Sequence, residues 1–146
     1  MNPFARFALS FTLLLCSSLA IANTPFTTFG DYSVLHTVFN STFLKPEVAS
    51  AYGLTRGKRH SLLNVAIIKN TAEGSTNGLP AEVSGTITNL MQQQKTLSFI
   101  EIKEQDAVYF LAPIRVDSEE MVHFRIEVKH DGQTYPVTFS KILYVD

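Results

Sequence analysis

The sequence has one cysteine, no tryptophan, and no long apolar run beyond its first 22 residues. The cysteine, Cys16, lies in a segment that we expect to be removed, so residues 23–146 have none. This excludes disulfides and thiolate metal sites from that part of the chain. No stretch after residue 22 has the roughly 20 apolar residues that a transmembrane helix requires, so stability must come from an ordinary hydrophobic core.

Excess charge is also missing. Without Arg6 in the leader, residues 23–146 carry 11 basic and 13 acidic side chains, a formal net charge of −2. Such a balance gives no overall field that would recruit nucleic acid or an anionic membrane. We therefore expect no nucleic-acid partner, and any electrostatic partner must be met locally.

The first 22 residues have the pattern of a secretory signal peptide. Arg6 supplies a positive start, residues 7–15 an apolar core, and Ala20-Ile21-Ala22 a cleavage signature before Asn23. Bulky Leu15 precedes Cys16, which argues against lipid attachment, and an uncleaved anchor is the minor alternative. We predict cleavage near Ala22-Asn23, export to the periplasm, and one domain over residues 23–146.

Every long segment after residue 23 alternates with a period of two and is rich in β-branched and aromatic residues. The clearest case is residues 121–129, where Val122, Phe124, Ile126 and Val128 face one way. Seven strands are predicted, at residues 31–39, 60–69, 81–90, 96–102, 107–116, 121–129 and 134–145. This pattern predicts an all-β, immunoglobulin-like or fibronectin-like antiparallel β-sandwich with one short helix in the first inter-strand connection.

Three details of this sandwich are also predicted. The apolar residues 60–69 indicate a central strand, and Pro113 indicates an edge or a bulge because proline lacks a backbone N–H. In the last strand the apolar positions change parity after Phe139, which predicts a bulge near Ser140-Lys141.

Catalytic motifs are absent from the sequence: it has no G-x-S-x-G, S-x-x-K or H-E-x-x-H pattern and no phosphate-binding glycine loop. The four histidines form no close pair, so we expect no enzymatic activity and no cofactor. One alternative is a small hydrolase or carbohydrate-active enzyme whose site assembles only in space, for example around His123. The acidic residues 117–120 could ligate calcium, although a solvated turn is the simpler interpretation.

The connection at residues 39–60, FNSTFLKPEVASAYGLTRGKRH, has two parts. Pro46 and Glu47 favour a helix start, and Gly53 a stop, so a short helix is predicted over residues 46–52. We expect this helix to close the hydrophobic end of the sandwich. The expected lid residues are Phe39, Phe43, Leu44, Pro46, Val48 and Tyr52.

The second part, RGKRH, gathers Arg56, Lys58, Arg59 and His60. Three fixed positive charges within four residues can receive a phosphate, a carboxylate or an acidic protein surface. The alternative is a solvated loop whose charges pair with Glu47 or other nearby acids.

The run FNSTFLKPEVASAYGLTRGKRHSLLNVAI, with VSGTITNL and the terminal FSKILYVD, resembles a family of small exported gammaproteobacterial proteins known only as a domain of unknown function. The pattern of Asn40-Ser41, Pro46-Glu47, Tyr52-Gly53, Arg56 and Asn64-Val65 carries the resemblance, with Gly57 in place of an expected serine. The resemblance implies a periplasmic β-domain without catalytic residues.

The leading interpretation is a noncatalytic periplasmic binding or accessory module, a monomer or weak oligomer. Residues 39–60 would contact an envelope protein or an anionic partner. A third alternative is a chaperone-like module that pairs β-strands, which requires an exposed sheet edge. Lysine and proline on the edge strands argue against this alternative.

Overall fold

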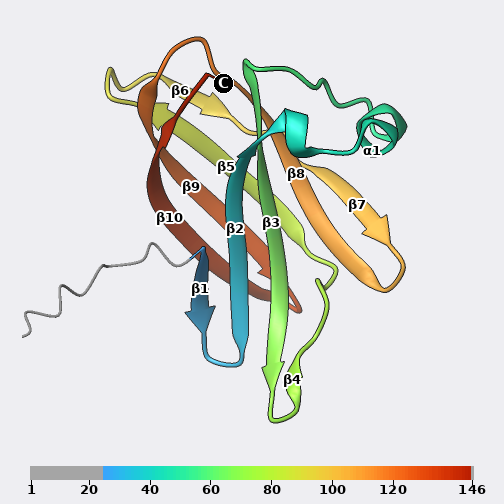
Figure 1. The fold of residues 1–146 in the computed structure, drawn as a ribbon. Coiled ribbons are helices and arrows are strands. Elements are labelled where there is room, and N and C mark those ends of the chain that lie inside the picture. Colours follow the sequence, from blue (N-terminus) through green and yellow to red (C-terminus); the bar gives the residue numbers. More distant parts are fainter. Residues whose placement is uncertain (1–24, 146) are drawn as a thin grey trace, which may run out of the picture.

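The computed structural model describes residues 25–145, which form a sandwich of two antiparallel sheets (Figure 1). In the first sheet the order is β1 (Phe26–Phe29), β2 (Tyr32–Asn40), β3 (His60–Thr71), β8 (Ala107–Arg115) and β7 (Ile100–Glu104), and β4 (Gly74–Ser75) pairs with β3. The second sheet has the order β10 (Gln133–Leu143), β9 (Glu120–His130), β5 (Glu82–Asn89) and β6 (Gln94–Thr96). The predicted all-β sandwich is confirmed.

The connection between β2 and β3 contains the expected short helix. A 3-10 turn, η1 (Ser41–Phe43), precedes α1 (Pro46–Ala51), in which Pro46 and Glu47 occupy the first turn. Gly53 follows with φ of 66°, a backbone conformation that glycine adopts without steric cost.

The main core lies between the two sheets. On β9, Val122, Phe124, Ile126 and Val128 are each no more than 2% exposed, as their alternation predicts. They pack against a cluster that includes Leu63, Val65 and Ile67 of β3. Each such side chain stabilises the fold by about 1.5–3 kcal/mol when fully buried.

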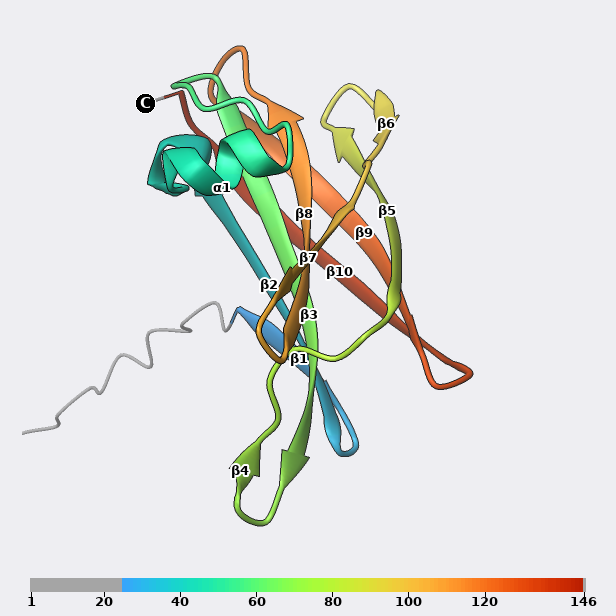
Figure 2. The ribbon, with the colours of Figure 1, turned by 90° about the vertical axis from the view of Figure 1, so that its right-hand side faces the viewer.

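A second core covers the outer face of the first sheet. Leu62 of β3, Leu111 of β8 and Ile102 of β7 pack there with Ala49 of α1 and with Leu54. In Figure 2, α1 lies on one side of the first sheet and the second sheet lies on the other. The central strand β3 is therefore covered on both faces, as its apolar sequence predicts.

The segment expected to form one strand at residues 96–102 is divided between the sheets. β6 ends at Thr96 in the second sheet, and β7 begins at Ile100 in the first. Leu97, at the crossing, is 7% exposed in the main core, and its N–H donates to the Gly85 carbonyl at 2.9 Å. A buried residue thus anchors the crossing, which alternation alone does not reveal.

The predicted bulge near Ser140 is wrong. β9 and β10 pair in one continuous register from Gln133↔His130 to Leu143↔Glu120. The parity change has another cause: Ile142 and Tyr144 lie on the solvent side, 37% and 54% exposed.

Pro113 lies on an open flank of β8, as predicted. β7 pairs with β8 only as far as Ile100↔Leu111, so no β7 residue is opposite Pro113. Proline therefore costs no ladder hydrogen bond on this flank.

Two predictions concern the start of the chain and the membrane. The predicted signal peptide, residues 1–22, lies outside the described residues. Within residues 25–145, no helix has the length and apolar character needed to cross a membrane.

Candidate functional site

The base of the connection between β2 and β3 is fixed by two buried polar residues, Asn40 at the end of β2 and Ser41 at the start of η1. Ser41 is 0% exposed; its hydroxyl donates to the Gly57 carbonyl at 3.1 Å and accepts from the Gly57 N–H at 2.9 Å. Asn40 Nδ2 donates to the Lys58 carbonyl at 3.3 Å, and its Oδ1 accepts from the Thr42 N–H at 2.9 Å. The backbone at residues 57–58 is thereby held against the sandwich.

The helix and its flanking residues form a lid, but on the outer face of the first sheet rather than over an open end of the sandwich. Among the expected lid residues, Phe39, Leu44 and Tyr52 pack against the second core. Val48 is half-buried and Pro46 is exposed.

Phe43 does not belong to the lid. Its side chain is 79% exposed because the 3-10 turn directs it to solvent, while Ser41 points inward. The inward apolar contacts come instead from Ala49 and Leu54.

One tyrosine beneath the lid is electrostatically perturbed. Burial, together with the negative charge of Glu104, raises the pKa of Tyr109 above its ordinary value of 10.0. Tyr109 is therefore neutral at physiological pH, as suits a residue packed beside the lid.

The basic loop, residues 56–60, follows the lid. Arg56 Nη2 donates to the Thr42 carbonyl at 2.9 Å, and Arg59 Nη1 donates to the Asp117 carbonyl at 3.0 Å. Lys58 is exposed, and His60 begins β3 opposite Arg115. Each arginine uses one of its five N–H donors in these contacts, so both retain donors that can face a ligand.

The positive charges of this loop are not neutralised by ion pairs. Within residues 25–145, the only salt bridges are Lys103–Glu101 at 3.5 Å and Arg115–Asp117 at 3.0 Å. The pairing of basic-loop charges with Glu47, considered above as an alternative, does not occur among the described residues.

The basic loop lies at one end of the sandwich. Figure 1 shows the loop before β3, the turn between β8 and β9 and the C-terminal end of the chain close together there. Asp117 and Glu119 lie in that turn and Glu120 begins β9. The Asp117 carbonyl accepts from Arg59, and its carboxylate pairs with Arg115. The loop therefore presents positive charge next to a smaller acidic turn.

The histidines do not converge on a common site. His36 stacks on Phe139 with ring centroids 4.4 Å apart, and burial lowers its pKa below 6.5. His130 Nδ1 contacts the Pro80 carbonyl at the far end of β9. Within residues 25–145, no group of three or more His, Cys, Asp or Glu side chains is arranged to hold a metal ion.

One contact between side chains has no signal in the sequence. His123 Nδ1 hydrogen-bonds Ser140 Oγ across the β9–β10 pair, on the exposed face of the second sheet. No carboxylate of residues 25–145 hydrogen-bonds the other nitrogen of His123. The pair thus lacks the third group that orients the base in a hydrolytic triad.

The anchoring role of Asn40 and Ser41 was only partly visible in the sequence. Polar side chains that end a strand commonly bond the nearby backbone. Their partners, however, lie 18 and 16 residues further along the chain, respectively. Only the folded connection shows that these two residues hold the basic loop.

The family described as "Domain of unknown function (DUF4426)" matches residues 26–146. A solved structure of a DUF4426 family protein from Pseudomonas aeruginosa PAO1 is similar to the chain, with 33% sequence identity and a TM-score of 0.75. The similarity covers 83% of this chain and 94% of that protein. No curated protein matches the chain.

Two further solved structures share the fold. FetP from uropathogenic Escherichia coli strain F11, recombinantly expressed in the periplasm of E. coli BL21(DE3), is 12% identical with a TM-score of 0.60, over 82% of this chain and 92% of FetP. A copper-bound variant of FetP is 13% identical with the same TM-score of 0.60, over 82% and 93%. At these identities the similarity supports a common fold and does not carry the copper site to this chain.

Proposed function

The chain belongs to the DUF4426 family, and we propose that this member is a noncatalytic binding module that receives an anionic partner through the basic loop. The partner surface that fits best is a cluster of carboxylates on an envelope protein. Arg56, Lys58 and Arg59 supply the charge, and His60 forms the border with β3.

A single observation carries this proposal: the loop backbone is fixed while its charges form no ion pair with any of residues 25–145. Ser41 and Asn40 hold Gly57 and Lys58 through three hydrogen bonds of 2.9–3.3 Å. A loop that is ordered before binding loses less conformational entropy on binding. Arginine forks match carboxylates in geometry as well as in charge.

A binding role without catalysis agrees with the placement of the titratable groups. The perturbed residues, His36 and Tyr109, lie on different elements and share no hydrogen bond. The enzymatic alternative has one observation in its favour, the contact between His123 and Ser140. A fluorophosphonate probe tests it directly, because an activated serine at position 140 would become labelled.

The periplasm is the proposed location of this module. The predicted signal peptide supports it. FetP, which has the same fold, was recombinantly expressed in the periplasm of E. coli BL21(DE3). Cell fractionation with an antibody to the chain tests this proposal, and recovery in the cytoplasm would contradict it.

The binding proposal is tested by chemical crosslinking and pulldown from envelope extracts with wild type, Lys58→Glu and Lys129→Glu. Lys58 is the suitable position because its side chain makes no hydrogen bond within residues 25–145, whereas Arg56 and Arg59 hold backbone carbonyls. Lys129 is an exposed lysine near the end of β9 that lies away from the basic loop, so Lys129→Glu is the matched charge control.

We expect a partner that wild type and Lys129→Glu capture and that Lys58→Glu loses. Equal capture by all three proteins would place the contact elsewhere. Equal loss of the partner in both variants would show that capture depends on the net charge of the chain and not on the basic loop.

A further inference from the structure

The two sheets meet along a seam where β2 of the first sheet faces β10 of the second. At one end, aromatic rings close this seam: Phe29 and Tyr32 of the β1–β2 hairpin lie with ring centroids 5.2 Å and 5.7 Å from that of Tyr135. Tyr32 also lies 5.4 Å from the ring of His130. This half of the seam is filled by the chain itself.

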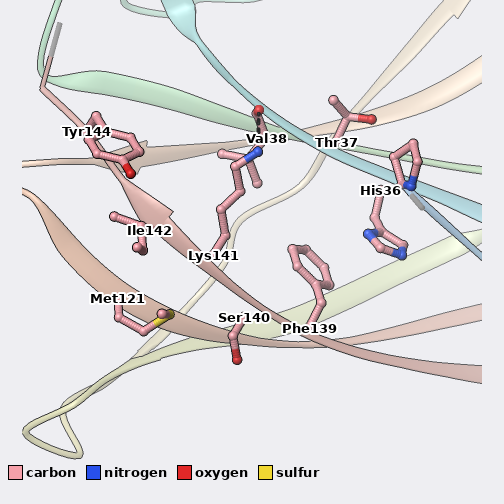
Figure 3. Close-up of a pocket in the computed structure, with 10 residues that line it drawn as sticks. His36, Thr37, Val38, Met121, Phe139, Ser140, Lys141, Ile142 and Tyr144 are labelled. Atoms are coloured by element: carbon pink, nitrogen blue, oxygen red, sulfur yellow. Dashed lines mark hydrogen bonds between the residues drawn. The ribbon is translucent and has the colours of Figure 1, made fainter. Parts of the chain in front are cut away.

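The other half of the seam is an open groove of about 680 Å³ (Figure 3). The residues that line it include His36, Val38, Phe139, Lys141, Ile142 and Tyr144. The groove begins where β1 stops. β1 pairs with β2 only up to Phe26↔Leu35, followed by one hydrogen bond from the His36 N–H to the Pro25 carbonyl at 2.9 Å.

The wall formed by β10 is a free strand edge. Asp131 and Gly132, with φ of 49° and 75°, form a two-residue hairpin turn, so Gln133 and His130 are a hydrogen-bonded pair. Alternation then directs the backbone groups of odd-numbered β10 residues to β9 and those of even-numbered residues away from it. Pro136, which has no backbone N–H, is one of the even-numbered residues whose backbone groups point away from β9, so it breaks no hydrogen bond of the β9–β10 pair.

Outward backbone groups of Thr138, Ser140 and Ile142 therefore border the open groove, and β9 is the only described strand that pairs with β10. A row of free N–H and C=O groups recognises another polypeptide backbone. The five residues 138–142 can align with a strand segment of about 13 Å, at about 3.3 Å per residue.

Lys141 gives this edge a charge preference. Its position in the strand directs it into the seam, where Nζ donates to the Val38 carbonyl at 3.4 Å (Figure 3). A charged residue that points inward on an edge strand discourages unselective pairing. A carboxylate on an added strand can form an ion pair with Lys141 in place of this long hydrogen bond, so Lys141 favours an acidic partner.

We propose that the groove accepts an extended peptide segment of another protein, with apolar side chains at alternate positions and an acidic residue that reaches Lys141. The segment would add a strand to β10, with its apolar side chains over Phe139 and Val38. Cleavage at the predicted Ala22-Asn23 site leaves only Asn23 and Thr24 before Pro25. Two residues are too short to line the edge at residues 138–142, so the occupant comes from another chain.

The test uses a phage-displayed library of random decapeptides, selected on the wild-type chain, and then fluorescence anisotropy with the selected peptides. Ser140→Pro removes an outward N–H without breaking the pairing to β9, as Pro136 already does at an equivalent position. Ser140→Ala is the matched control, because it removes only the hydroxyl that contacts His123.

We expect selected peptides with alternating apolar residues and an acid, a roughly tenfold loss of affinity in Ser140→Pro, and wild-type affinity in Ser140→Ala. Lys141→Glu should shift the selected peptides from acidic to basic. If Ser140→Pro does not fold, hydrogen exchange on the wild type with and without a selected peptide tests the same proposal. A bound strand should slow exchange of the Ser140 and Ile142 amides.

Three results would overturn the proposal. The first is a selection without enrichment, and the second is equal binding by Ser140→Pro and Ser140→Ala. The third is a dimer of the wild type without peptide that Ser140→Pro abolishes, which would assign the edge to a second copy of the chain.

Discussion

Ser41→Ala removes the hydroxyl that joins the end of β2 to the basic loop. That hydroxyl is 0% exposed and takes part in two hydrogen bonds, as donor to the Gly57 carbonyl and as acceptor from the Gly57 N–H. A buried backbone group that loses its partner costs about 1–3 kcal/mol. Gly57 is half-buried, so water can replace part of the loss. We therefore expect a decrease of about 2 kcal/mol in the free energy of unfolding.

Urea denaturation measures this decrease. For a domain with an m-value of about 2 kcal/mol/M, a loss of about 2 kcal/mol lowers the midpoint by about 1 M. Ser98→Ala is the control, because Ser98 is exposed and its side chain makes no hydrogen bond within residues 25–145. A midpoint shift in Ser41→Ala no larger than that of Ser98→Ala would refute the anchoring role.

Three further predictions concern pH, the lid and catalysis. Burial lowers the pKa of His36 below 6.5, so the folded chain binds fewer protons than the unfolded chain and its stability should fall as pH decreases below about 6.5. His36→Phe should weaken that dependence in urea midpoints measured at about pH 5 and pH 7.5, and an unchanged dependence would assign it to other groups. Leu62→Ala should cost about 2–5 kcal/mol by opening the second core, whereas Phe43→Ser should cost less than about 0.5 kcal/mol; equal costs in urea titrations would contradict the placement of the lid. Intact-mass spectrometry after treatment with a fluorophosphonate should find no adduct on Ser140, and a stoichiometric adduct would favour the hydrolase alternative.

Local pattern was sufficient for most of the fold. Alternation on β9 identified the core-facing residues because one side of an antiparallel strand is buried and the other is wet. Pro46 and Gly53 marked the short helix because each residue has a restricted or special backbone conformation. These signals act over a few residues and need no knowledge of tertiary contacts.

Two of the failures have the same cause, which is contact between distant segments. The crossing at Leu97 depends on a hydrogen bond to Gly85 in another strand, and the position of the lid depends on apolar residues of β7 and β8. Exposed Ile142 and Tyr144 mimicked a bulge, because a period-two pattern cannot distinguish a register shift from apolar residues on a solvent face. The anchoring of the basic loop was hidden because Asn40 and Ser41 bond backbone groups 18 and 16 residues further along the chain.

If the basic loop binds anionic groups, as we propose, the affinity of the chain for a fluorescein-labelled hexaglutamate peptide should depend on salt and on Lys58. We expect binding by wild type and Lys129→Glu that weakens as salt increases, and weaker binding by Lys58→Glu. Equal affinities for Lys58→Glu and Lys129→Glu, or affinity that does not change with salt, would contradict the proposal.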